Sequence, residues 1–274
     1  MKRYAASMVT ALGGTIIDAV ARFGGFVRFA AAALRAVALG WRSWGKWPRL
    51  GRQLYLIGTR SVPVLVVTGA VVGAILAIES FAQFRELGQE RRLGILVNVS
   101  IVRQIGPVLA GVMLAGRVGS ALTAELGSMR VTEQLDAMRV MAADPLRVLV
   151  APRFVGCVVM IPVLTMASNV CGFAGGWLVT TVFYGVDSGA YWRFSADFID
   201  WFDVLSGLVK SVFFGGAIAL VACYKGFTCG GGAQGVGRAT TESFVLSFIA
   251  IVLLNLVLAK LLNDIDAIRL SLGG

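Results

Sequence analysis

The sequence contains no histidine among its 274 residues. This removes the commonest general base and the commonest metal ligand of proteins. The four cysteines, at positions 157, 171, 223 and 229, lie in or beside apolar runs and form no C-x-x-C pair. We expect them to be small buried hydrophobic residues. Neither a catalytic acid–base site nor a metal site is therefore expected in this chain.

Charge is also scarce. Only 15% of the residues are charged, whereas 57% are hydrophobic and the mean hydropathy is +0.81. A typical soluble domain carries about 25% charged residues. The composition therefore predicts an integral membrane protein rather than a soluble domain. Residues 1–40 lack the short apolar core and small-residue cleavage site of a signal peptide, so none is expected.

Five stretches are apolar enough, and long enough, to approach the roughly 20 residues that cross a bilayer as a helix. The predicted spans are residues 61–78, 93–116, 154–186, 204–224 and 243–259. The third is longer than one crossing needs, so it is either tilted or continues past the membrane, and Pro162 could kink it. Small residues are frequent in all five, which favours close helix packing. The fold class predicted is all-α.

The basic residues are distributed unevenly. With the N-terminus inside, 17 Lys and Arg fall in inside segments and 6 in outside segments. Because cytoplasmic loops are enriched in Lys and Arg, this split predicts an N-in, C-out topology. We attribute the net charge of +10 to the basic residues of cytoplasmic segments and to their contact with anionic lipid headgroups. No nucleic-acid partner is expected.

Residues 1–52 form a basic region without a span. Arg28, Arg35 and Arg42 recur every seven residues and would line one face of a helix. Apolar residues accompany that stripe, and Trp41, Trp44 and Trp47 precede the first span. The pattern predicts an amphipathic helix in the inner membrane interface. A soluble basic arm is the alternative.

A short amphipathic helix is predicted between spans two and three. Val131, Leu135, Met138 and Ala142 recur at the spacing of one helical face. The pair Asp144-Pro145 then predicts a new helix start, with an N-cap followed by proline. The segment is either a solvated connector or a docking element for a soluble partner.

The segment "GPVLAGVMLAGRVGSALTAELGSMRVTEQLDAMRVMAADPLRVLVAPRF", residues 106–154, closely resembles the signature region of MlaE/YrbE-type permeases. "RQLY" at 52–55, "LVKSVFF" at 208–214 and "GVGRATT" at 235–241 are further matches. These permeases are membrane subunits of ABC systems that work with MCE proteins on lipids. The resemblance implies a permease domain over residues 53–274 in a bacterial inner membrane.

The resemblance also implies partners and mechanism. It implies a homodimer with a phospholipid cavity at the subunit interface, an MCE-domain partner, and an ATPase subunit on another chain. It implies that a helix at about residues 128–140 is the coupling helix seated on that ATPase. ATP and Mg would bind the ATPase, so no cofactor is expected in this chain. The residues assigned to coupling are Glu125, Gly127, Val131, Glu133, Gln134, Leu135, Asp136 and Met138.

Arg103 and Lys210 are the basic residues inside predicted spans, and no acidic residue lies in those spans to pair with them. A phospholipid phosphate could bind both by charge-assisted hydrogen bonds. Alternatively they snorkel or bond backbone carbonyls. Both match basic positions of the family's cavity region. Gln104 departs from its pattern, in which glutamate is common, and this would leave Arg103 without a neighbouring anion. Arg52 is a weaker candidate for a headgroup contact.

The stretch "GGGAQGVGRATT", residues 230–241, has the glycine spacing of a phosphate-binding loop. A P-loop requires Lys and then Ser or Thr after its last glycine, whereas Arg238 and Ala239 follow Gly237. We interpret the glycines as a tight turn, with Thr240 or Thr241 capping the fifth span.

Two alternative functions for the chain are a gradient-driven transporter or channel and a membrane-embedded enzyme. Both would be expected to carry acidic residues or histidines within the spans.

Overall fold

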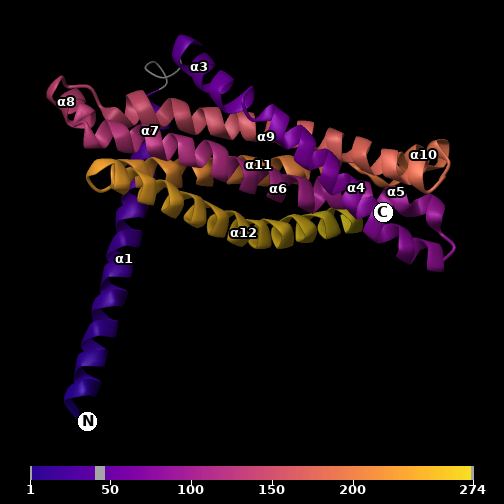
Figure 1. The fold of residues 1–274 in the computed structure, drawn as a ribbon, viewed down its shortest axis with the longest axis horizontal. Coiled ribbons are helices and arrows are strands. Elements are labelled where there is room, and N and C mark those ends of the chain that lie inside the picture. Colours follow the sequence, from indigo (N-terminus) through magenta and orange to yellow (C-terminus); the bar gives the residue numbers. More distant parts are fainter. Residues whose placement is uncertain (1, 41–46, 273–274) are drawn as a thin grey trace.

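The computed structural model describes residues 2–40 and 47–272, and within them every regular element is helical (Figure 1). The all-α prediction is confirmed for this part of the chain. The helices are α1 Lys2–Leu39, α3 Trp47–Gly58, α4 Val62–Glu86, α5 Leu93–Ser100, α6 Gly106–Leu114, α7 Ser120–Val131, α8 Gln134–Val140, α9 Ala151–Leu178, α10 Ser188–Phe198, α11 Trp201–Phe227 and α12 Gly232–Leu272.

Five helical stretches of the described residues are long and apolar enough to cross a membrane, as the sequence predicted. They are Leu50–Glu86, Leu93–Val131, Leu146–Phe183, Trp201–Phe227 and Gly232–Arg269. Four of them extend beyond the predicted span, because hydropathy falls at charged residues while the helical hydrogen bonds continue; the third begins earlier than predicted, at Leu146, but ends at Phe183, before the predicted end at residue 186. The second stretch, for example, continues past Arg117 to the end of α7.

Two of these stretches contain π-helical turns, two turns inside Leu93–Val131 and one at each end of Leu146–Phe183. The turns are Ile101–Ile105, Ala115–Gly119, Leu146–Val150 and Val179–Phe183. A π-helical turn accommodates an extra residue and reorients the side chains that follow, and such turns are frequent at functional sites. Helix α9 continues through Pro162. Arg103 lies in the first of the four turns.

Helices α4 and α9 pack closely through glycine. A Cβ atom added at Gly73 would lie 1.9 Å from the Gly172 carbonyl oxygen, and one at Gly175 would lie 2.0 Å from the Ala70 carbonyl oxygen. Neither position can hold a larger residue unless the two backbones separate. The predicted close packing through small residues is confirmed here.

Helix α1 projects steeply away from the bundle (Figure 1). Its second half packs against the bundle through Phe29, Ala33 and Ala36, while Arg28 and Arg35 are exposed on another face. The segment is therefore helical, and Phe23, Val27 and Leu34, which the prediction counted among its apolar partners, are exposed. Arg42, Trp41 and Trp44 lie outside the described residues. Helix α3 crosses the domain boundary that the sequence analysis placed at residue 52.

The bundle has an α8 end and an α10 end, which lie opposite one another (Figure 1). At the α10 end, the Tyr191 hydroxyl donates to Asn98 Oδ1 at 3.0 Å, and Asn98 Nδ2 donates to Ser195 Oγ at 2.9 Å. This buried cluster holds α10 on α5. Burial raises the pKa of Tyr191 to about 12, so its hydroxyl remains a donor near neutral pH.

The glycine stretch differs from its prediction. Helix α12 begins at Gly232, where φ is +76°, so Thr240 and Thr241 lie inside the helix rather than at its cap. Both hydroxyls bond the Gly237 carbonyl oxygen, at 2.6 and 3.3 Å. The turn is confined to the residues before Gly232. The predicted cap is therefore wrong, because the fifth helix starts well before the apolar run.

Candidate functional site

Arg103 and Lys210 meet at the first π-helical turn. Lys210, on α11, donates from Nζ to the Arg103 carbonyl oxygen and to Gln104 Oε1, both at 2.7 Å. Pro107 lies four residues after Arg103 and has no N–H with which to donate to that carbonyl. Lys210 therefore donates to a carbonyl oxygen that lacks the i+4 N–H donor of an α-helix. The backbone-carbonyl contact considered for Lys210 is therefore present in the structure.

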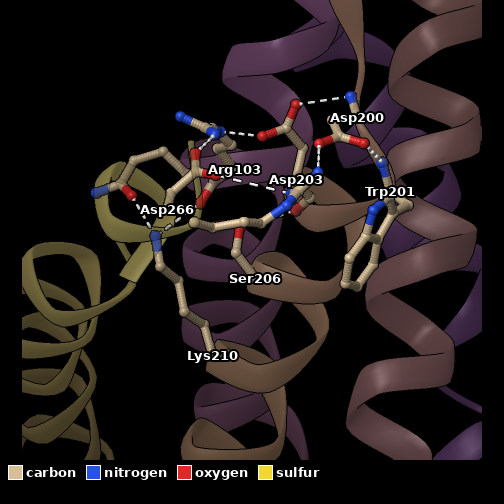
Figure 2. Close-up of polar contacts among 9 residues, drawn as sticks. Arg103, Asp200, Trp201, Asp203, Ser206, Lys210 and Asp266 are labelled. Carbon is tan, nitrogen blue, oxygen red and sulfur yellow. Dashed lines mark hydrogen bonds and ion pairs between the residues drawn. The ribbon is translucent and has the colours of Figure 1, made fainter. Parts of the chain in front are cut away.

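Two carboxylates hold the Arg103 guanidinium (Figure 2). Its Nε donates to Asp203 Oδ1, and one Nη donates to Asp266 Oδ2 at 2.6 Å. The side chain of Asp203 is 4% exposed and that of Asp266 is 16% exposed. The expectation that Arg103 lacks an anion is wrong, because its partners come from the first turn of α11 and the last turns of α12, outside the predicted spans.

Asp200, Trp201 and Arg269 extend this ion-pair network. The Asp200 and Asp203 side chains form a capping box at the start of α11. Arg269 donates to Asp200 Oδ2 at 2.5 Å and lies 4.9 Å from the centre of the Trp201 ring. These residues were not among those predicted from the sequence. The two aspartates three positions apart before an apolar run were a readable signal for a helix start.

A pocket of about 260 Å³ opens beside Arg103. Arg103, Gln104 and Lys210 line it together with residues of α5, α11 and α12, including Val99, Ser206, Leu262 and Asn263. The Arg103 side chain is 37% exposed, so its charge remains accessible despite its two ion pairs. The structure therefore brings together three of the four residues assigned to the lipid cavity.

Arg52 lies in a different place. It lines a pocket of about 210 Å³ with Gln53 on α3 and with residues around the start of α9, including Arg153. The Arg153 guanidinium is almost fully buried and donates to Glu125 Oε1 at 2.9 Å. Glu125, assigned to coupling, is thus tied to the start of α9.

The predicted coupling helix is divided in two. Helix α7 ends at Val131, Glu133 adopts a left-handed conformation with φ of +58°, and α8 begins at Gln134. The Thr132 hydroxyl bonds the Ser128 carbonyl oxygen at 2.9 Å at this break. The expected single helical face from Val131 to Ala142 is therefore wrong. The predicted helix start after Asp144 is confirmed, since the Leu146 N–H donates to its carboxylate at 3.0 Å.

The residues of the α7–α8 segment have different surroundings. Leu135 is buried within the chain, Met138 is partly buried, and Val131, Glu133 and Gln134 are exposed. Asp136 accepts hydrogen bonds from Arg130 and Arg139 at 3.1 and 2.8 Å, so its charge is paired within the segment.

Neighbouring residues complete this end of the bundle. The Gly127 carbonyl accepts from the Cys229 thiol at 3.5 Å, which ties α7 to the segment before α12. Val140 is 88% exposed and Met141 is also exposed, which leaves an apolar tip on this end of the bundle.

Comparison with known proteins identifies a family that covers most of the chain. The family model described as "Permease MlaE" matches residues 50–261. The "Intermembrane phospholipid transport system permease protein MlaE" of Haemophilus influenzae is 35% identical over 93% of this chain and 97% of its own length. A "Probable ABC transporter permease protein" of Rickettsia typhi is 41% identical over 77% of this chain and 82% of its own length.

A plant relative is also similar. The chloroplast protein TRIGALACTOSYLDIACYLGLYCEROL 1 of Arabidopsis thaliana is 34% identical over 78% of this chain and 61% of its own length. The last residues of α12, with Asp266 and Arg269, lie beyond the region that the family model matches.

Proposed function

The chain belongs to the MlaE permease family, and from this premise we propose that it is the membrane subunit of an ABC transporter for phospholipid or a related lipid. In this proposal the lipid moves between a bacterial inner membrane and an MCE-domain partner. A separate ATPase subunit supplies the energy, and this chain itself catalyses no reaction.

The pocket beside Arg103 is the observation that carries the proposal. Arg103 forms two side-chain ion pairs, and Lys210 forms two hydrogen bonds. A guanidinium has five N–H donors and an ammonium has three, so both groups keep donors for a further anion. A phosphate in the pocket would gain charge-assisted hydrogen bonds from both. The apolar helices around it suit acyl chains.

The α8 end is the proposed contact with the ATPase. In an N-in, C-out topology this end faces the cytoplasm, where the exposed Glu133 and the apolar tip at Val140 and Met141 are free to dock. Leu135 instead anchors α8 to the permease itself. The ion pair of Glu125 with Arg153 would pass movement of this segment to α9. A segment held at both ends transmits displacement, whereas a loose loop absorbs it.

The outer face of α12 is the proposed contact with a second copy of the chain. Phe248, Val252 and Leu256 are exposed along this helix. A groove of about 820 Å³ runs between α1, α11 and α12 beside it. A homodimer would cover part of this apolar surface, and lipid would cover the remainder.

The proposal is tested by ATP hydrolysis in nanodiscs after co-expression with the candidate ATPase and MCE partners. We expect phospholipid to stimulate hydrolysis by the native complex. The variant Arg103→Ala/Asp203→Asn should lose this stimulation but keep basal hydrolysis. Glu133→Arg should lower the amount of ATPase that co-purifies. If no ATPase co-purifies with the native chain, the ABC assignment fails and a gradient-driven transporter replaces it.

A further inference from the structure

The C-terminal turns of α12 bring a carboxylate to the most exposed cation of the pocket. Asp266 lies beyond the residues matched by the family model, and its Oδ2 accepts from Arg103 at 2.6 Å. It lies one helical turn past Leu262 and Asn263, which line the pocket. Asp266 therefore stands at the edge of the pocket, on the face that continues its wall.

Arg269 and Trp201 hold this part of α12 in place. Arg269 donates to Asp200 at 2.5 Å, lies 3.8 Å from Asp266, and stacks its guanidinium over the Trp201 ring. These contacts join the end of α12 to the start of α11. Asp266 is thus held in place beside the pocket through its contacts with Arg103 and Arg269.

The charges at the pocket balance. Arg103, Lys210 and Arg269 carry three positive charges. Asp200, Asp203 and Asp266 carry three negative charges. An added phosphate leaves one uncompensated negative charge, which costs free energy in an environment of low polarity. A ligand that also carries an ammonium group restores neutrality, because the ammonium can approach Asp266 while the phosphate binds the remaining donors of Arg103 and Lys210.

We propose that Asp266 makes this pocket select phospholipids with a zwitterionic, ammonium-bearing headgroup over anionic lipids that lack an amine. This inference rests on the proposed lipid pocket and adds its substrate class. Asp266 is a specificity-determining residue in this scheme, and Asp203 remains to hold Arg103 when Asp266 is changed.

The test is photocrosslinking from inside the pocket. A diazirine-bearing residue replaces Val99 in the full chain. The variant is reconstituted in nanodiscs that contain either phosphatidylethanolamine or phosphatidylglycerol, each labelled in its phosphate group. In the native background we expect the phosphatidylethanolamine adduct to exceed the phosphatidylglycerol adduct by about fivefold or more. Asp266→Asn should bring the ratio close to one. Asp264→Asn is the matched control, because Asp264 is exposed on the same helix.

The outcomes separate the two proposals. Equal adducts in the native chain, or a ratio that Asp266→Asn leaves unchanged, would overturn the headgroup selection. An adduct that persists with both lipids in Arg103→Ala/Asp203→Asn would instead overturn the lipid pocket itself. Thermal unfolding of each variant, measured in parallel, identifies any loss of adduct that comes from unfolding.

Discussion

Arg103 places a positive charge among apolar helices, and its partners make that placement stable. Asp203 is nearly buried, and Arg103 is the cation that pairs with its carboxylate. Removing one member of such a pair costs more than removing both, because the remaining charge loses its partner in an environment of low polarity. The stability of this region therefore depends on the pair as a unit.

The first prediction follows from this dependence. Arg103→Ala should lower the free energy of unfolding by about 3 kcal/mol. Adding Asp203→Asn should recover part of that loss, because the orphaned charge is gone. Thermal unfolding in detergent measures both effects. A double variant no more stable than Arg103→Ala would show that Asp203 does not depend on Arg103.

The second prediction concerns the charge of Glu133, whose backbone is left-handed. Asp and Asn both tolerate this conformation better than other residues with a side chain, so they separate the charge from the backbone. We expect Glu133→Asp to keep the ATPase bound and Glu133→Asn to release it several-fold more readily. Co-purification measures the difference, and equal retention by the two variants would remove Glu133 from the proposed contact.

Half of the charged residues around the pocket could be predicted from the sequence. Arg103 and Lys210 could be selected because a cation inside an apolar run is rare. Asp203 and Asp266 could not, because they lie outside the apolar runs and their separations from Arg103 are 100 and 163 residues. Hydropathy predicts where each membrane span ends, but it does not predict which helix ends are in contact in the folded protein.

At the scale of elements, the contact between α4 and α9 depends on the absence of side chains. Gly73→Ala should destabilise the fold by about 1–3 kcal/mol, because the added Cβ would overlap the Gly172 backbone. Gly24→Ala is the control, since a Cβ there meets nothing within 4 Å. Thermal unfolding distinguishes them. Equal stability of the two variants would mean that α4 and α9 can separate without cost.

The elements also show where periodicity misleads. Five apolar runs predicted five membrane-length helices, because burial in a bilayer depends on length and composition. The break at Glu133 was missed, because the apolar spacing continues across it while the backbone reverses into the left-handed region. The π-helical turn that contains Arg103 leaves no mark in hydropathy either.

At the scale of the whole molecule, the topology predicts which end faces which compartment. Val140→Cys at the α8 end should react with a membrane-impermeant maleimide from the cytoplasmic side, and Leu87→Cys after α4 from the opposite side. Labelling in right-side-out and in inverted vesicles distinguishes the two sides of the membrane. Labelling of the unsubstituted chain measures the background from its native cysteines. Reversed accessibility would contradict the N-in, C-out topology.

The central claim is that this chain moves phospholipid whose headgroup contacts Arg103. The most direct measurement is ATP-dependent transfer of a labelled phospholipid between nanodiscs holding the full complex and the MCE partner. The native complex should transfer label only with ATP, and a complex with a hydrolysis-deficient ATPase should not. Arg103→Ala/Asp203→Asn should lower the transfer rate at least about tenfold. Transfer that proceeds without ATP, or at the native rate in that variant, would contradict the claim.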